Sequence, residues 1–208
     1  MIDAIKSAVE TGKLKQIEGI VQEALEAGAN AEDILNTMVA TMDEIGEKFQ
    51  RNEIFVPNML VAALTMKKGV GVLQPLLAGD SVGKFGKFII GTVAGDLHDI
   101  GKNLVALMVE SAGFEVIDLG VDVPAEKFIE AIKDNPQCKV VGLSSLLTTT
   151  MDAMKITVEA IIEAGLKDQV KIMIGGAPIT SEFKDEICAD AYAPDAGSAA
   201  AMAKELAF

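Results

Sequence analysis

Residues 87–113, KFIIGTVAGDLHDIGKNLVALMVESAG, decide the fold of the second half of this chain. Residues 87–93 are rich in β-branched and aromatic side chains and predict a strand. Residues 102–112 repeat apolar side chains at helical spacing and predict a helix. The loop between them carries His98, the only histidine of the chain. A strand, a loop and a helix in this order predict the first part of a βαβ unit.

The same alternation continues to the end of the chain. Strands are predicted at residues 87–93, 115–119, 140–143, 171–174 and, from a weaker pattern, 191–193. Helices are predicted at residues 102–112, 125–133, 150–164, 181–188 and 197–206. This order predicts an α/β fold, a doubly wound, five-stranded parallel sheet of the flavodoxin-like or Rossmann-like kind. Because ligands of such sheets bind at the carboxyl ends of the strands, we expect the functional residues in the loops that follow them.

The first half of the chain is predicted to be helical throughout. Apolar positions recur at helical spacing over residues 2–11, 14–27, 31–50 and 57–77, which predicts an antiparallel four-helix bundle. Pro57 suits the first turn of the fourth helix, where its missing N–H is not needed. Residues 79–84 (GDSVGK) predict a linker. We therefore expect a helical domain at residues 1–80 and an α/β domain at residues 86–208.

Charge and composition exclude several classes of partner. The formal net charge of −13 repels nucleic-acid phosphates and anionic lipid, so we expect neither nucleic acid nor membrane as a partner. The N-terminus shows no signal peptide, and no apolar run reaches the length of about 20 residues that a membrane helix needs. Cys138 and Cys188 have no Cys or His at metal-ligand spacing. These features predict a cytoplasmic protein with reduced thiols.

His98 is the main candidate for a functional side chain. A lone histidine is usually a surface or hydrogen-bonded residue, but this one follows a predicted strand, and Asp96 precedes it by two positions. An imidazole that ligates a metal normally donates its other N–H to a carboxylate, a role that Asp96 is placed to fill. A single histidine cannot build a zinc or iron site from protein ligands alone. It suits a metal whose macrocycle supplies the other ligands, and both haem and a corrinoid meet that condition.

Other chemistries fit this loop poorly. A Walker A loop would need four residues between Gly95 and Gly101-Lys102, where the chain has five, and Asn103 stands where Ser or Thr should bind magnesium. The carboxylates of Asp96 and Asp99 would also repel a phosphate. Neither the G-x-G-x-x-G fingerprint of dinucleotide sites nor the G-x-S-x-G elbow of hydrolases occurs in the loop around His98.

At this point the sequence resembles a known family. Asp96-x-His98-x-x-Gly101 matches the corrinoid-binding signature of cobalamin-dependent methyltransferases and mutases. Further matching pieces follow in order, namely Ser144-x-Leu146 with Thr148, then Gly175-Gly176, then Tyr192-Ala193-Pro194-Asp195-Ala196. The second half is similar to the cobalamin domain of methionine synthase and to the corrinoid proteins of methylamine, methanol and O-demethylase systems.

The first half takes part in the same resemblance. Its matching segments are Met42-x-x-x-Gly46-x-x-Phe49, Phe55-Val56-Pro57 and Ala62-Ala63-x-x-Met66, which are similar to the helical cap of those proteins. The resemblance therefore covers nearly the whole chain. Because no methyltransferase barrel or substrate domain is recognisable in the sequence, the expected relative is the stand-alone carrier.

The resemblance implies cobalamin as the cofactor, bound with its benzimidazole base off the cobalt and His98 as the lower axial ligand. Asp96 would bond the far imidazole nitrogen, and Ser144 would support Asp96. The full set of implied cofactor-binding residues is Gly95, Asp96, Leu97, His98, Asp99, Ile100, Gly101, Ser144, Leu146, Thr148, Gly175, Gly176, Ala193, Ala196, Met59 and Met66. Other interpretations remain open for some of them: a plain turn at Gly175-Gly176, a helix N-cap at Ser144-Ser145 or Thr148-Thr149-Thr150, and ordinary bundle core at Met59 and Met66.

The implied function is that of a methyl carrier, not catalytic by itself, whose cobalt alternates between Co(I) and methyl-Co(III). The implied partners are a substrate-specific methyltransferase, a second methyltransferase that passes the methyl group to tetrahydrofolate or a thiol, and a reductive activase. The cap would move about a hinge at residues 79–84. A mutase subunit, a cobalamin sensor and a receiver-like signalling domain are the alternatives. The sequence identifies neither the methyl donor, which is a methylamine, methanol, a methoxyaromatic or a betaine, nor the oligomeric state.

Overall fold

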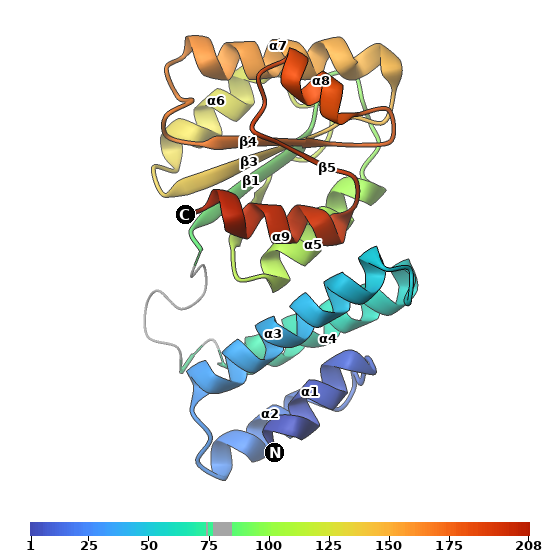
Figure 1. The fold of residues 1–208 in the computed structure, drawn as a ribbon. Coiled ribbons are helices and arrows are strands. Elements are labelled where there is room, and N and C mark those ends of the chain that lie inside the picture. Colours follow the sequence, from blue (N-terminus) through green and yellow to red (C-terminus); the bar gives the residue numbers. More distant parts are fainter. Residues whose placement is uncertain (74, 77–84) are drawn as a thin grey trace. The chain divides into compact units, whose positions relative to one another are not determined.

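The structure, a computed structural model, describes residues 1–73, 75–76 and 85–208 (Figure 1). The chain divides into two compact units, of which one holds the N-terminal helices and the other consists of Phe85–Glu110 and Phe114–Phe208. The predicted linker at residues 79–84 lies outside the described residues. Its role as a hinge therefore stays a prediction.

The N-terminal unit contains the four predicted helices: α1 (Ile2–Glu10), α2 (Ile17–Glu26), α3 (Ala31–Gln50) and α4 (Val56–Leu73). The side chain of Asn30 caps α3 by accepting the N–H of Glu32 at 2.7 Å. Pro57 lies in the first turn of α4, as predicted. The second helix begins three residues later than predicted, because the N–H of Gln16 bonds the carbonyl of Lys13 in a tight turn instead.

The core of this unit consists of apolar side chains that recur at helical spacing. Its fully buried members include Ile5, Val9, Ile17, Val21, Ile34, Met38, Met59, Ala63 and Leu73. Helices α3 and α4 approach each other closely at Gly69, where an added Cβ would lie 2.6 Å from Cε of Met38. No helix in the described part of the chain is long and apolar enough to cross a membrane.

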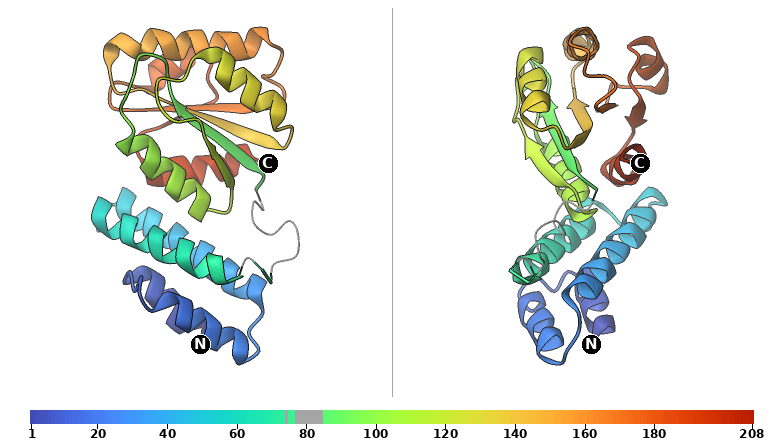
Figure 2. Two further views of the ribbon diagram at one scale, coloured as in Figure 1. Left: turned by 180° about the vertical axis from the view of Figure 1, so that it is seen from behind. Right: turned by 90° about the vertical axis from the view of Figure 1, so that its left-hand side faces the viewer.

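The second unit is a parallel sheet with the strand order β2-β1-β3-β4-β5. Its strands are β1 (Lys87–Thr92), β2 (Glu115–Asp118), β3 (Cys138–Ser144), β4 (Lys171–Gly175) and β5 (Ala191–Ala193). The connecting helices are α5 (Ile100–Ser111), α6 (Ala125–Asp134), α7 (Met151–Glu163), α8 (Ser181–Glu186) and α9 (Ala196–Leu206). Helices α6 and α7 cover one face of the sheet, and α5 and α9 cover the other (Figures 1 and 2). The predicted five-stranded, doubly wound fold is confirmed, including its short last strand.

Two glycines in the sheet make room for buried aromatic rings. A Cβ added at Gly91 would lie 2.7 Å from Cζ of Phe128, and one added at Gly142 would lie 2.8 Å from Cζ of Phe88. Both rings are fully buried, and burial of each contributes roughly 1.5–3 kcal/mol. The remaining core on the α6 and α7 side includes Ile89, Val141, Leu143, Ile172, Ile174, Ile132, Met154 and Val158. This packing fixes the strands, and therefore the loops at their carboxyl ends.

Candidate functional site

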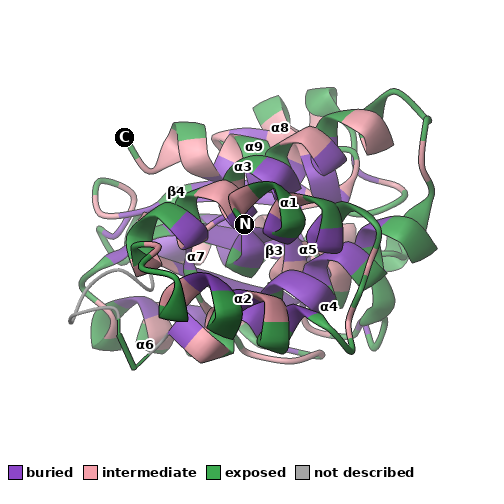
Figure 3. Ribbon diagram, turned by 90° about the horizontal axis from the view of Figure 1, so that it is seen from below, coloured by how far each residue is buried: buried purple, intermediate pink, exposed green. Residues whose placement is uncertain are grey.

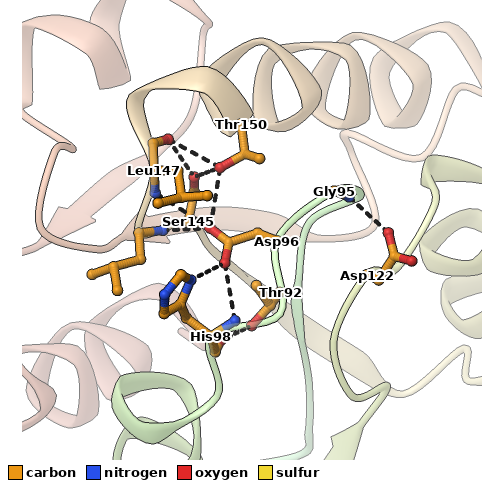
Figure 4. Close-up of polar contacts among 9 residues, drawn as sticks. Thr92, Gly95, Asp96, His98, Asp122, Ser145, Leu147 and Thr150 are labelled. Carbon is orange, nitrogen blue, oxygen red and sulfur yellow. Dashed lines mark hydrogen bonds and ion pairs between the residues drawn. The ribbon is translucent and has the colours of Figure 1, made fainter.

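The candidate site lies where the strand order reverses. Strands β1 and β3 are neighbours in the sheet. After β1 the chain crosses to β2 on one side, and after β3 it crosses to β4 on the other side. Ligands of doubly wound sheets bind beside such a switch point. The loops that follow β1 and β3 meet here, and they bring His98 and Asp96 together with residues 145–150 (Figure 4).

Asp96 is the centre of the polar network in Figure 4. Its side chain is fully buried. Oδ1 accepts the backbone N–H of His98 at 3.0 Å and lies 2.7 Å from the ring atom Nδ1 of the same residue. Oδ2 accepts the N–H of Leu146 at 2.7 Å and the hydroxyl of Thr150 at 3.1 Å. One carboxylate therefore connects the loop after β1 with the loop after β3.

The charge of Asp96 follows from these contacts. Burial of the carboxyl raises its pKa, but the hydrogen bonds from the N–H groups of His98 and Leu146, from the His98 ring and from the Thr150 hydroxyl outweigh burial. Together they hold the pKa of Asp96 well below its ordinary range. The carboxylate is thus a fixed negative charge at neutral pH, with acceptor sites only.

The prediction that Ser144 supports Asp96 is wrong. Ser144 ends β3 and pairs with Gly175 in the ladder, whereas Thr150 donates to Asp96 from the end of a 3₁₀ turn (Thr148–Thr150). Ser145, not Ser144, extends the network, because its hydroxyl lies 2.8 Å from that of Thr150. The sequence signal for this arrangement is a pair of hydroxyl residues five positions apart, on either side of a tight turn.

His98 presents one ring nitrogen to the outside. Its side chain is half exposed, and Nδ1 is occupied by Asp96. Because Asp96 can only accept, Nδ1 of the neutral ring carries the proton, and Nε2 keeps its lone pair. Within the described residues, Nε2 takes part in no hydrogen bond. Donation of one ring nitrogen to a carboxylate, with the other ring nitrogen bare, is typical of histidines that ligate a metal.

Exposed apolar side chains flank His98 in the sequence and occur in the loop after β3. Leu97 and Ile100 are 72% and 84% exposed, and Leu146 and Leu147 in the opposite loop are also exposed. Large exposed apolar side chains gathered in one place mark a binding surface. No group of three or more His, Cys, Asp or Glu side chains in the described parts of the chain could hold a bare metal ion. The residues fit a metal that arrives in its own apolar macrocycle and lacks one axial ligand.

The other predicted site residues of this unit also lie at the carboxyl edge of the sheet. Gly176 has φ of 130°, and an added Cβ would lie only 1.8 Å from the carbonyl oxygen of Ser145. Two loop backbones therefore lie in contact at Gly176, where a side chain does not fit. Contact of Gly175 and Gly176 with the cofactor stays a prediction. Thr148 is exposed, whereas Ala193 and Ala196 are buried. Their contact with a cofactor tail stays a prediction.

The two predicted cap residues are part of the helical core. Met59 is fully buried and Met66 is 2% exposed, which favours the bundle-core alternative for both. Apolar side chains that are exposed lie elsewhere on α4 and just before it, at Phe55, Val56, Leu60, Val61 and Leu64. Figure 3 shows α4 with buried and exposed residues alternating along it. Contact of Met59 or Met66 with the cofactor stays a prediction.

Comparison with known proteins agrees with this site. Residues 86–203 match the model of a B12 binding domain, and residues 1–74 match a second model with the same description, B12 binding domain. The chain belongs to the B12-binding corrinoid proteins. Cobalamin is therefore the cofactor of this corrinoid protein. The site agrees with this, because it offers one histidine flanked in the sequence by exposed apolar side chains.

Relatives and solved structures match this corrinoid protein along its length. The dimethylamine corrinoid protein of Methanosarcina barkeri is 41% identical over 207 residues, which is 99% of this chain and 97% of the relative. A cobalamin-binding protein from Desulfitobacterium hafniense superposes with a TM-score of 0.83 at 29% identity, covering 99% of this chain and 98% of that one. The methanol:cobalamin methyltransferase complex of M. barkeri contains a chain that superposes with a TM-score of 0.85 at 27% identity, covering 99% of this chain and 79% of that one.

Proposed function

We propose that this corrinoid protein carries methyl groups on cobalamin for partner methyltransferases, with Nε2 of His98 as the lower axial ligand of cobalt in place of the benzimidazole base. The observation that carries the proposal is the 2.7 Å contact between Nδ1 of His98 and the buried carboxylate of Asp96, which leaves Nε2 bare on a half-exposed ring. When bound, cobalamin supplies the cobalt centre on which the methyl group is carried.

The residues of the site have distinct roles in this proposal. Asp96 holds the proton on Nδ1 and increases the basicity of the ligating nitrogen. Leu146 and Thr150 hold Asp96 through hydrogen bonds of 2.7 and 3.1 Å, so the carboxylate cannot turn away from the ring. The exposed side chains of Leu97 and Ile100 provide apolar surface for a flat ring and exclude water from its underside.

Named relatives support a methylamine as the methyl donor. The dimethylamine corrinoid protein is 41% identical and covers nearly the same length, whereas the chain in the methanol complex is 27% identical. That complex also supports a substrate-specific methyltransferase as a direct partner. The second methyltransferase, its tetrahydrofolate or thiol acceptor, the reductive activase and the cytoplasmic location stay predictions.

The presence of a single histidine makes the ligand assignment directly testable. The untagged protein would be produced once with ordinary histidine and once with ¹⁵N-histidine, loaded with hydroxocobalamin, reduced to Co(II) and measured by electron paramagnetic resonance. If His98 binds cobalt, the nitrogen coupling changes from three lines to two in the labelled sample. A coupling that stays at three lines would assign the ligand to the benzimidazole and overturn the proposal.

The carrier role needs a separate measurement. The cobalamin-loaded protein would first be reduced to Co(I) with titanium(III) citrate. Transfer of a methyl group from dimethylamine to Co(I), which releases methylamine, would then be followed by the absorbance of the cofactor in the presence of a dimethylamine methyltransferase. We expect methylation with this donor and enzyme, and none with methanol and a methanol methyltransferase. A loaded protein that accepts no methyl group from any donor would favour the sensor or mutase alternatives.

A further inference from the structure

Thr92 contacts the backbone of His98 directly. It is the last residue of β1, it is fully buried, and its hydroxyl donates to the carbonyl oxygen of His98 at 2.9 Å. The position of Thr92 itself is fixed by the sheet edge, because its N–H bonds the carbonyl of Gly120 at 3.0 Å and its carbonyl accepts the N–H of Val123 at 2.9 Å. The hydroxyl is therefore a rigid anchor under the loop.

The rest of the loop is held from the side of β2. The N–H of Gly95 donates to the carboxylate of Asp122 at 2.7 Å, and the N–H of Asp122 donates to the carbonyl of Asp96 at 2.9 Å. Asp96 in turn fixes the N–H and the ring of His98. Every one of these contacts holds groups that precede the His98 carbonyl along the chain. Only the hydroxyl of Thr92, among the hydrogen bonds to this loop in the described residues, fixes the peptide group that follows the His98 side chain.

We propose that Thr92 is a positioning residue for His98: its hydroxyl sets the orientation of the peptide between His98 and Asp99, and thereby where the imidazole presents Nε2. The inference rests on the proposed function, in which Nε2 binds cobalt. A ligand held in its bound geometry before the cofactor arrives does not lose conformational freedom on binding. Without the hydroxyl, the His98 carbonyl loses its hydrogen-bond partner and the peptide is free to rotate. Rotation of the peptide would then shift the imidazole and its Nε2 atom.

The test compares three variants that separate the hydrogen bond from the shape of the side chain. Thr92→Val keeps the shape and removes the hydroxyl, whereas Thr92→Ser keeps the hydroxyl. Thr157→Val is the matched control, because Thr157 is also buried in the same unit and its hydroxyl donates within α7, to the carbonyl of Ala153. Each protein would carry ¹⁵N-histidine, which labels His98 alone.

The test has three readouts. In the cofactor-free protein, hydrogen exchange of the His98 amide reports the order of the loop. In the loaded protein, the apparent dissociation constant for hydroxocobalamin and the ¹⁵N coupling to Co(II) report how well Nε2 is presented. We expect Thr92→Val to speed amide exchange and to weaken cobalamin binding about fivefold, as for the loss of one hydrogen bond. Thr92→Ser and Thr157→Val should stay within about twofold of the original protein.

Each outcome decides the question. If the unmodified protein shows no ¹⁵N coupling, the ligand assignment fails and the role of Thr92 fails with it. If the coupling is present but Thr92→Val exchanges and binds like the control, only the role of Thr92 is overturned. Should Thr92→Val not fold, the unmodified protein still provides a test: the Thr92 hydroxyl proton should be protected from solvent exchange and close to the backbone of His98. A rapidly exchanging hydroxyl proton would contradict the inference.

Discussion

Nδ1 of His98 and Oδ1 of Asp96 lie 2.7 Å apart, and the same oxygen accepts the backbone N–H of His98 at 3.0 Å. The aspartate therefore grips the histidine at two points, the ring and the main chain. A ring turned by half a revolution would lose the first contact and keep the second. The pair fixes which nitrogen is presented, not only where the residue lies.

Removal of this carboxylate should weaken cofactor binding. We expect Asp96→Ala to lower the affinity for hydroxocobalamin by about 10- to 100-fold, the range found when the outer partner of a metal-ligating histidine is lost. Titration of the absorbance of the bound cofactor measures it. Asp134→Ala, which removes an exposed carboxylate at the end of α6, is the control and should bind normally. Equal affinity for both variants would contradict the role given to Asp96.

A side chain at Gly176 should push two loops apart. A Cβ there would lie 1.8 Å from the carbonyl oxygen of Ser145, at φ of 130°, so Gly176→Ala is expected to lower the free energy of unfolding by about 2–4 kcal/mol. Urea titration of the cofactor-free protein measures the loss. Gly19→Ala is the control, because an added Cβ in α2 meets nothing within 4 Å and should be neutral or stabilise by up to about 1 kcal/mol. If Gly176→Ala were as stable as the control, the close approach would be wrong.

The two cysteines should differ sharply toward thiol reagents. Burial raises the pKa of the Cys138 thiol to about 11, although hydrogen bonds to Ile89 and Val140 and the charge of Lys87 act in the opposite direction. At pH 8 this thiol therefore stays protonated as well as inaccessible. Cys188 is exposed. We expect a disulfide reagent at pH 8 to modify one thiol of the folded protein and two after denaturation, and Cys188→Ser to abolish the native reaction.

The raised pKa of the Cys138 thiol should also make the stability of the folded protein depend on pH above the ordinary range of thiols. Because the folded-state pKa of Cys138 lies above that of an unfolded thiol, the folded state holds its proton while the unfolded chain releases it. The stability that Cys138 contributes is complete below the unfolded pKa and is lost as the pH rises toward 11. Cys138→Ala should remove this part of the decline of the melting temperature with pH. An unchanged pH profile would show that the thiol does not titrate with folding.

Two substitutions at Asp122 should separate the effect of its hydrogen bond to Gly95 from the effect of its strained backbone. This aspartate has φ of 53°, which glycine adopts without cost, so Asp122→Gly removes the carboxylate while it relieves the backbone. Asp122→Asn keeps an acceptor oxygen at the same position. We expect faster hydrogen exchange of the Gly95 amide, by about fivefold, in Asp122→Gly but not in Asp122→Asn. Equal exchange in both variants would mean that the 2.7 Å bond does not hold the loop.

The fold and part of the site follow from the sequence for a clear physical reason. Before residue 86 the apolar residues recur at helical spacing, whereas after it β-branched runs alternate with helical segments, so the sheet was predictable. The motif loop at residues 95–101 follows the first strand, so the position of the histidine was predictable as well. The start of α2 was missed because Leu14 fits the helical spacing although its N–H bonds Gly12 in a turn.

The hydrogen-bond partners of Asp96 were harder to predict from the sequence. Ser144 and Thr150 carry the same hydroxyl chemistry, and only the 3₁₀ turn at Thr148–Thr150 decides which of them reaches the carboxylate. Sequence spacing cannot give the direction of a side chain across such a turn. Nor does the sequence decide between bundle core and cofactor contact for Met59 and Met66, because α4 is apolar on most of its faces and periodicity does not tell a core position from an exposed one.

Asp96 bonds groups in two loops, one after β1 and one after β3, and this has a consequence for how related carriers can differ in sequence. Its second oxygen belongs to the loop after β3, where it accepts from Leu146 and Thr150. Under the proposed ligation of cobalt by His98, a substitution in that loop would change the electron density at the imidazole through the shared Asp96 carboxylate, although the loop lies fifty residues away in the sequence. The reactivity of the metal would then be adjusted without any change in the histidine motif itself.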